Sequence, residues 1–168
     1  MIGLNVGYSQ KSNILSNSDY DNMKLNGTRK LADFESSNDY DQLLSDVNLF
    51  QSLGKSCSND PITGRTCRYV SQSLNIITAN GELSSFNFLD SSNYISFNGV
   101  NITVGSPKTI LQGLFPNAYS NEKIIEDDDG QNRSALVFLI GSTDSIASLI
   151  FIFDSNNNIY KIERFNWL

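Results

Sequence analysis

The densest cluster of reactive side chains in this 168-residue sequence is a run of four carboxylates and a glycine: Glu126, Asp127, Asp128, Asp129 and Gly130. Like charges this close repel, so they need solvent, a cation or a basic partner. The template of an EF-hand calcium loop fails, because counting back from the glycine places Ile125 at the first ligand position. Three interpretations follow: a solvated loop, a surface that enters the basic cleft of a partner protein, or a weak cation site.

Histidine is absent from the whole chain. Its absence excludes a Ser-His-Asp or Cys-His nucleophile and any His-ligated metal site. What remains for an enzyme is a pair of carboxylates, as in glycoside hydrolases, or a Ser-Lys or Tyr-based site. The carboxylates cluster in expected loops and helix ends, so the sequence predicts a protein that is not an enzyme. We therefore expect no catalytic residue, no cofactor and no metal.

The two cysteines, Cys57 and Cys67, lie in a polar segment rich in turn-forming residues. Their spacing is not the C-x-x-C of a redox enzyme, and two thiols are too few for a metal site. We predict a short-loop disulfide that stabilises the fold by about 2–3 kcal/mol. Such a bond indicates an oxidising compartment, the periplasm or beyond. The alternative is a pair of free thiols in a cytosolic protein.

Two helices are expected to support these groups. Apolar residues at helical spacing predict the first over residues 39–53, which Gly54 ends. Ser106 as the cap and Pro107 at the first helical position predict the second, which Pro116 ends.

Alternating apolar residues predict strands over much of the remaining chain. An Asn80-Gly81 hairpin turn separates strands at 67–78 and 83–89, and a further extended stretch covers 93–104. After a polar, acidic loop at 117–133, a three-strand antiparallel meander is expected over 135–141, 147–154 and 159–166. The middle strand of this meander is nearly all apolar, so it should be central and buried on both sides.

Together these elements predict an α+β fold, with two main helices packed on one face of an antiparallel sheet. The order of a helix followed by several strands occurs twice, which suggests two degenerate helix–meander units. Residues 1–28 are poorly patterned and are interpreted as a partly ordered N-terminal arm, followed by one domain over 29–168.

The segment Asn98–Pro116 reads NGVNITVGSPKTILQGLFP: a strand that ends in Val-Gly, a Ser-capped helix and then Phe-Pro. This pattern resembles small bacterial envelope proteins, namely the outer-membrane assembly lipoprotein family SmpA/OmlA and the beta-lactamase inhibitory protein. The resemblance covers residues 98–168, less than half of the chain. It implies helix-plus-meander units and a function in binding.

The net charge of −6 disfavours phosphate backbones and anionic membrane surfaces as partners and favours a basic protein. Only 18% of the residues are charged, and Ser and Asn supply much of the polarity, which suits an exported protein. No run is apolar enough for membrane insertion. No signal peptide is visible in the sequence; for an exported protein, we expect that the signal peptide has been removed.

The sequence thus predicts a periplasmic or secreted bacterial inhibitor or immunity protein that neutralises a toxin or an enzyme. Its expected contact is the run Glu126 to Asp129. The alternatives are an envelope assembly or structural protein and a His-free glycan hydrolase. The sequence leaves the identity of the partner and the oligomeric state open.

Overall fold

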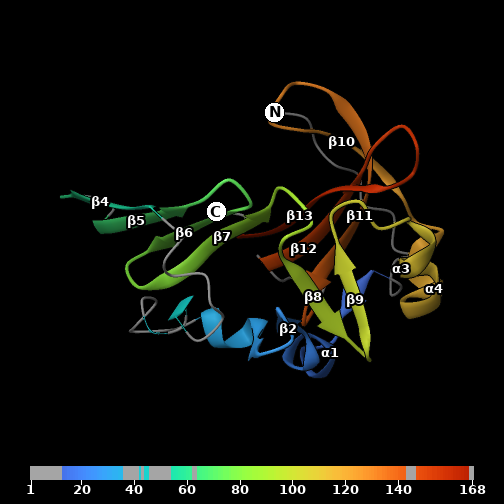
Figure 1. The fold of residues 1–168 in the computed structure, drawn as a ribbon, viewed down its shortest axis with the longest axis horizontal. Helices are drawn as coiled ribbons and strands as arrows, with labels where there is room; N and C mark the ends of the chain where they lie inside the picture. The colour runs from blue at the N-terminus through green and yellow to red at the C-terminus, as the bar shows by residue number, and fades with distance from the viewer. Residues whose placement is uncertain are drawn as a thin grey trace.

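The computed structural model describes residues 13–35, 42, 44–45, 54–61, 64–142 and 147–166. Strands dominate these residues, and they form two sheets (Figure 1). The larger sheet contains nine strands: β1 (Ile14–Leu15), β4 (Gly54–Asp60), β5 (Gly64–Val70), β6 (Leu74–Ala79), β7 (Glu82–Phe88), β10 (Lys123–Glu126), β11 (Asn132–Ile140), β12 (Ala147–Phe153) and β13 (Ile159–Asn166).

The strand order in this sheet is β1-β11-β12-β13-β7-β6-β5-β4, and β10 pairs with the first part of β11. Every pairing is antiparallel except that of β1 with β11, so the sheet is mixed. The pairing of β13 with β7 joins the C-terminal meander to the strands that precede it in the chain. One continuous sheet therefore spans both halves of the sequence.

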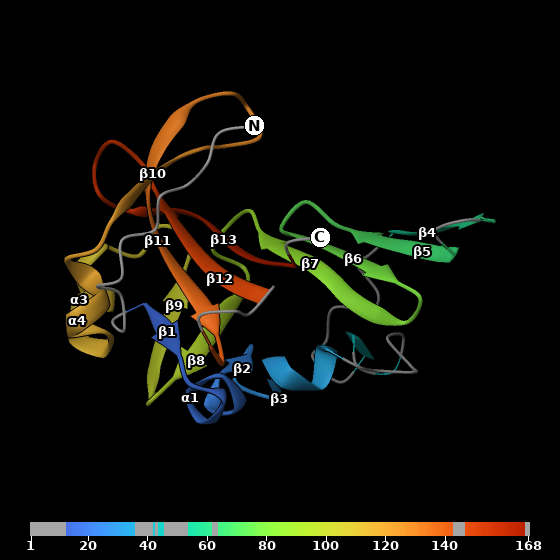
Figure 2. The same cartoon turned by 180° about the vertical axis from the view of Figure 1, so that it is seen from behind.

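A second layer covers one face of this sheet (Figure 2). It consists of a small sheet in the order β3-β2-β8-β9, the helix α1 and the 3-10 helix η1. The bounds of these elements are β2 (Lys24–Leu25), β3 (Arg29–Lys30), β8 (Tyr94–Phe97), β9 (Val100–Thr103), α1 (Asn17–Asn22) and η1 (Leu31–Phe34). Two further short helices, α3 (Thr109–Leu114) and α4 (Pro116–Tyr119), flank the sheet.

The main core lies between the two layers. Buried side chains of the small layer, such as Met23, Ile95 and Phe97, belong to the same apolar cluster as Phe88 and Phe151 of the large sheet. Removing this apolar surface from water is the main stabilising term of such a fold. β12 runs through the centre and is buried on both faces, as its nearly all-apolar sequence predicts.

The predicted fold class is wrong. The described chain is mostly β, with short helices, and no pair of main helices covers one face of an antiparallel sheet in that part of the chain. A small sheet occupies the place expected of helices, since side chains from either kind of element can bury an apolar face. The two expected helix–meander units are instead merged through β13 and β7.

The predicted helix at 39–53 lies mostly outside the described residues; Gln42, Leu44 and Ser45 are described there and are helical. The second predicted helix is shorter than expected. The helix begins at Thr109. Pro107 was expected in its first turn, but this residue forms an isolated β-bridge with Asn158 instead. Pro116 does end this helix, but it also begins α4.

Several strand predictions are confirmed. The Asn80-Gly81 turn joins β6 to β7, with φ of 53° and 84°, and the three C-terminal strands lie within three residues of their expected bounds. The stretch at 93–104 is not one extended segment but the hairpin β8–β9, which turns at Asn98-Gly99. The expected loop at 117–133 contains most of α4, all of β10 and the first residues of β11.

The expected N-terminal arm at 1–28 falls partly outside the described residues. Residues 13–28 contribute β1, α1 and β2. Across the described residues, no helix combines the length and hydropathy that a membrane span requires.

Candidate functional site

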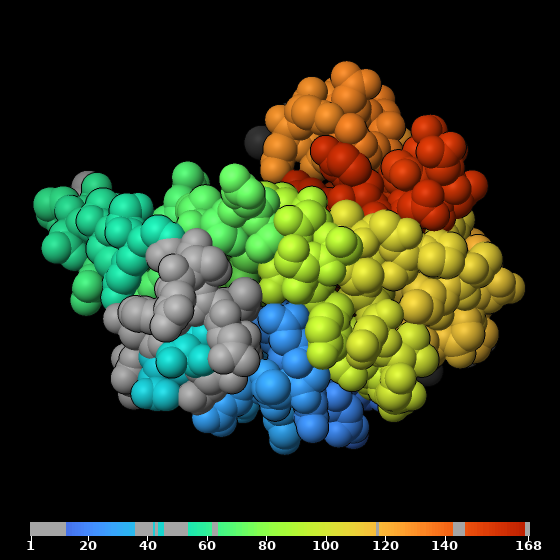
Figure 3. Space-filling model, in the orientation of Figure 1, coloured from blue at the N-terminus to red at the C-terminus, as the bar shows by residue number. Residues whose placement is uncertain are grey.

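The carboxylate run lies at the tip of the hairpin formed by β10 and β11. Its turn is closed by two backbone hydrogen bonds: Asp127 N–H donates to Gln131 O at 2.9 Å, and Gly130 N–H donates to Asp127 O at 2.8 Å. This hairpin and the turn between β12 and β13 project at the same end of the molecule, in orange and red in Figure 3. The run is therefore an ordered, protruding turn.

Two basic side chains from neighbouring strands hold this turn. Lys161 Nζ on β13 lies 3.0 Å from Asp127 Oδ1 and 2.9 Å from Asp128 Oδ2. Arg133 on β11 contacts Asp127 Oδ2 at 3.1 Å and donates from both guanidinium Nη atoms to Asp129, each at 2.6 Å. Asp127 is buried by these contacts, whereas 87% of the Asp128 side chain remains exposed.

Lys161 is the centre of the cluster and is itself buried, with 6% of its side chain exposed. Burial alone would lower its pKa, but hydrogen bonds to Glu163, Asp128 and Asp127 raise the pKa of Lys161 well above its ordinary value. Burial also raises the pKa of Glu163, against the opposing effect of Lys161 at 2.7 Å. Lys161 is therefore a permanent cation that clamps the turn, not a neutral amine that could act as a nucleophile.

The pair of Asp129 and Arg133 is the second clamp. The hydrogen bonds from the Arg133 guanidinium lower the pKa of Asp129 to about 2 and raise that of Arg133. The guanidinium also stacks on the Tyr160 ring, 4.3 Å from its centroid. A planar guanidinium suits both contacts, because it binds a carboxylate with two donors and packs on an aromatic face.

Arg133 and Lys161 are thus two cations that contact four carboxylates, so the cluster keeps a net negative charge; these carboxylates are Asp127, Asp128, Asp129 and Glu163. Glu126 and Asp128 stay exposed, whereas Asp127 is turned inward. Nothing in the sequence near the run identifies Arg133 or Lys161 as its partners. Lys161 comes from a strand 34 residues away, and only the strand pairing brings it near Asp127.

An open pocket of about 520 Å³ lies beside this cluster. Its walls come from the start of β11, the end of β12 and the β12–β13 turn, and it is lined by Gln131, Asn132, Arg133, Ser134, Phe153, Asp154, Ser155, Asn157 and Tyr160. The sequence patterns predicted none of these as site residues, because their nearness depends on how β11, β12 and β13 are aligned.

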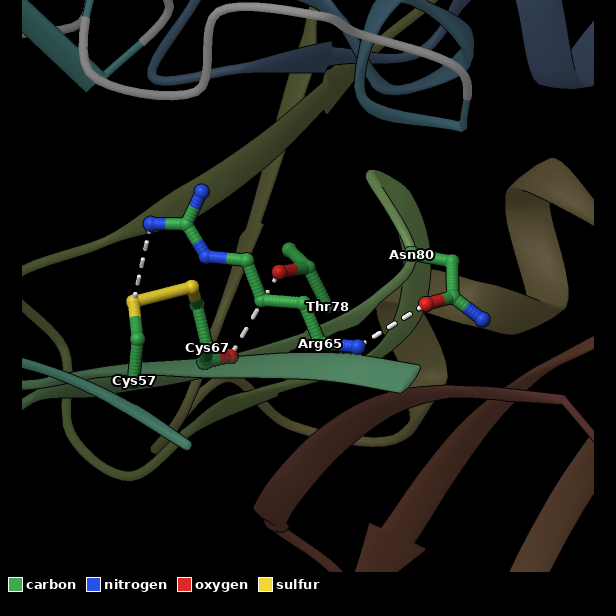
Figure 4. Close-up of a disulfide and its surroundings, with 5 residues drawn as sticks. All are labelled: Cys57, Arg65, Cys67, Thr78 and Asn80. Carbon is green, nitrogen blue, oxygen red and sulfur yellow. Dashed lines mark hydrogen bonds between the residues drawn. A yellow bond between two sulfur atoms is a disulfide. The ribbon is translucent and has the colours of Figure 1, made fainter. Parts of the chain in front are cut away.

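The predicted disulfide is confirmed: Cys57 on β4 is bonded to Cys67 on β5 (Figure 4). These residues face each other in the β4–β5 register, so the bond crosses a hairpin at the edge of the large sheet. The Arg65 guanidinium donates to Cys57 Sγ at 3.8 Å. Asn80, in the β6–β7 turn, accepts from the Arg65 N–H at 2.9 Å. The disulfide therefore supports an edge hairpin and does not form part of the acidic cluster.

A second buried polar network lies under the opposite face of β13. Arg164 is 2% exposed; its guanidinium binds both carboxylate oxygens of Glu35 and donates to the carbonyl oxygens of Leu83 and Ser84. The Tyr20 hydroxyl donates to the same carboxylate at 2.5 Å. Burial and then the Glu35 charge raise the pKa of Tyr20 well above 10, so this tyrosine is not an activated base. The network serves to join the N-terminal layer to the sheet.

The described residues also bear on metal and hydrolase chemistry. Among them, no three acidic or thiol side chains are arranged to hold a metal ion. A glycan hydrolase would need two carboxylates that face an open cleft. In the acidic cluster, Lys161 Nζ instead lies between Asp127 and Glu163 and contacts both.

The chain was compared with family models, curated proteins and solved structures. None of them matches it, so the resemblance of residues 98–168 to envelope proteins stays an expectation.

Proposed function

We propose that this chain is a non-catalytic protein-binding protein that contacts its partner through the tip of the β10–β11 hairpin. The observation that carries the proposal is the clamped acidic turn. Lys161 and Arg133 hold the turn in one conformation while Glu126 and Asp128 stay exposed. A surface ordered before binding loses less conformational entropy when the partner arrives.

The hairpin also carries an exposed apolar side chain. Ile124 on β10 is 70% exposed, two residues before Glu126. At a protein interface, such a side chain can supply an apolar contact while the charges around it guide orientation. This combination supports a protein partner with a basic rim and an apolar depression.

Within this class, an exported bacterial inhibitor or immunity protein is the form we propose, with a basic toxin or enzyme as the target. The disulfide at an exposed edge supports an oxidising compartment, and the residual negative charge of the hairpin supports a basic target.

The test uses two variants that remove equal charge. The variant Glu126→Gln/Asp128→Asn changes the hairpin, whereas Asp21→Asn/Glu82→Gln removes two exposed carboxylates elsewhere. Wild type and both variants are immobilised, and proteins captured from the secreted and envelope fractions of the source cells are identified. The captured protein is then purified, and its affinity is measured at two salt concentrations.

We expect the hairpin variant to bind at least about tenfold more weakly than the control variant and to show a shallower salt dependence. Ile124→Ser should also weaken binding, whereas Leu89→Ser, at another exposed apolar position, should not. Equal affinities of the hairpin and control variants for the purified partner would contradict the proposed surface.

A further inference from the structure

We propose that the pocket beside the acidic hairpin is a binding site for a neutral saccharide of one or two rings. This inference is separate from the proposed protein contact, because it rests on the pocket walls and not on Glu126 or Asp128. The volume of about 520 Å³ lies within the range of small-molecule sites, roughly 300–1,000 Å³.

The first observation is that Arg133, the cation of the pocket lining, is already paired, and that Asp154 accepts hydrogen bonds from its own turn. Arg133 is bound to Asp127 and Asp129, and Asp154 Oδ1 accepts from the backbone N–H groups of Asn156 and Asn158. Breaking these contacts would cost more than an ordinary hydrogen bond. An anionic ligand therefore finds no free cation in the pocket, and the neighbouring carboxylates would also repel it.

The second observation is that most neutral polar side chains of the pocket are exposed and have no partner within the described chain, so they can meet a ligand. Within the described part of the chain, five polar lining side chains make no hydrogen bond to another residue: Gln131, Asn132, Ser155, Asn157 and Tyr160. Each amide offers two donors and an acceptor, and the phenol hydroxyl offers one of each. A ligand that matches this lining carries many hydroxyl groups, each of which both donates and accepts.

The third observation is the aromatic wall. Tyr160 is 41% exposed, and Arg133 stacks on its ring. An aromatic ring with a polar end suits a ligand with both C–H surfaces and hydroxyl groups. A purely apolar ligand does not fit, because the remaining apolar wall, Phe153, is only 2% exposed. Neutral saccharides meet all three conditions.

Asn157 allows a matched test. It has a φ of 60°, and Asn98 in the β8–β9 turn has a φ of 49°, so glycine replaces either residue without backbone strain. Asn157→Gly removes an amide from the pocket, whereas Asn98→Gly makes the same change outside it. Tyr160→Phe removes the hydroxyl group but keeps the ring that stacks on Arg133.

The probes are cellobiose, maltose and N,N′-diacetylchitobiose, with glucose and glucuronate as a neutral and charged pair. Binding is followed by amide chemical shifts on the full chain. We expect at least one disaccharide to give saturable shifts confined to residues 131–134 and 153–160. We also expect glucose to bind more tightly than glucuronate.

Asn157→Gly should weaken the binding by about tenfold, Tyr160→Phe should weaken it less, and Asn98→Gly should leave it unchanged. The proposal is overturned if none of the three disaccharides saturates, if the shifts lie elsewhere, or if the two glycine variants behave alike. The capture of a protein partner by the hairpin does not depend on these results, so the two proposals fail separately.

Discussion

At the scale of single residues, Asp129 shows how a local partner sets the protonation of an exposed carboxyl group. Its pKa of about 2 lies below the ordinary 3.8, mainly because Arg133 donates to the ionised form. Because the folded pKa is the lower one, this pair stabilises the fold above about pH 4 and is lost as the pH falls through about 2.

A pH titration of the Asp129 carboxyl by NMR should therefore have its midpoint near 2 in the wild type. In Arg133→Gln the midpoint should rise toward 3.8, whereas Lys123→Gln on the same hairpin should leave it unchanged. A wild-type midpoint near 3.8 would show that the two side chains are not paired in solution.

The pKa of Tyr20 is shifted upward, in the opposite direction to that of Asp129, so its effect on stability is seen at high pH. Its buried hydroxyl donates to Glu35, so the pKa of the folded state is raised. This contribution to stability is fully present below about pH 10 and decreases above it, because only the unfolded chain then ionises readily. The free energy of unfolding, measured with urea at about pH 9 and 11, should fall more steeply in wild type than in Tyr20→Phe.

At the scale of elements, the β4–β5 hairpin depends on its disulfide. Every residue of β4 is exposed, so the strand has little apolar burial of its own. Reducing the bond should lower the free energy of unfolding by about 2–3 kcal/mol and speed hydrogen exchange in β4 and β5 more than in β12 and β13. Ser58→Ala on the same strand should change neither quantity. Uniform acceleration of exchange across the sheet would refute this local role.

The β10–β11 hairpin depends instead on an ion-pair clamp. Lys161→Met removes one of the two cations that bind the buried Asp127. The change should cost about 2 kcal/mol of stability, because the carboxylate keeps only Arg133 as its counter-ion. The amides of Asp127 and Gly130 should exchange faster. Lys123→Met, at an exposed position on β10, is the control; equal effects of both variants would argue against the clamp.

At the scale of the whole molecule, Arg164 and Glu35 connect segments 129 residues apart. Glu35→Gln should destabilise the fold by about 3 kcal/mol, because it leaves the Arg164 charge buried without a counter-ion. Adding Arg164→Met should cost far less than the same change in the wild type. A double-mutant cycle from urea unfolding should give a coupling above about 1 kcal/mol, and additive effects would exclude the pairing.

Patterns within short stretches of the sequence predicted those elements that depend on residues close together along the chain. The turn at Asn80-Gly81, the three C-terminal strands and the disulfide all follow from turn preference, alternation and short spacing. The prediction that Ser106 and Pro107 begin a helix was wrong, because Pro107 forms a β-bridge with Asn158. Local preference decides an element only where no contact from elsewhere in the fold competes.

The sequence by itself determined an acidic, His-free chain with a run of four carboxylates, and it predicted the disulfide that the structure confirms. Only the tertiary structure decided that β13 joins β7 in one sheet and that Lys161 clamps Asp127. It also decided that Tyr160 and Asn157 line one pocket. The reason is physical: the alignment of distant strands is set by burying both faces of a sheet at once, and no short segment carries that requirement.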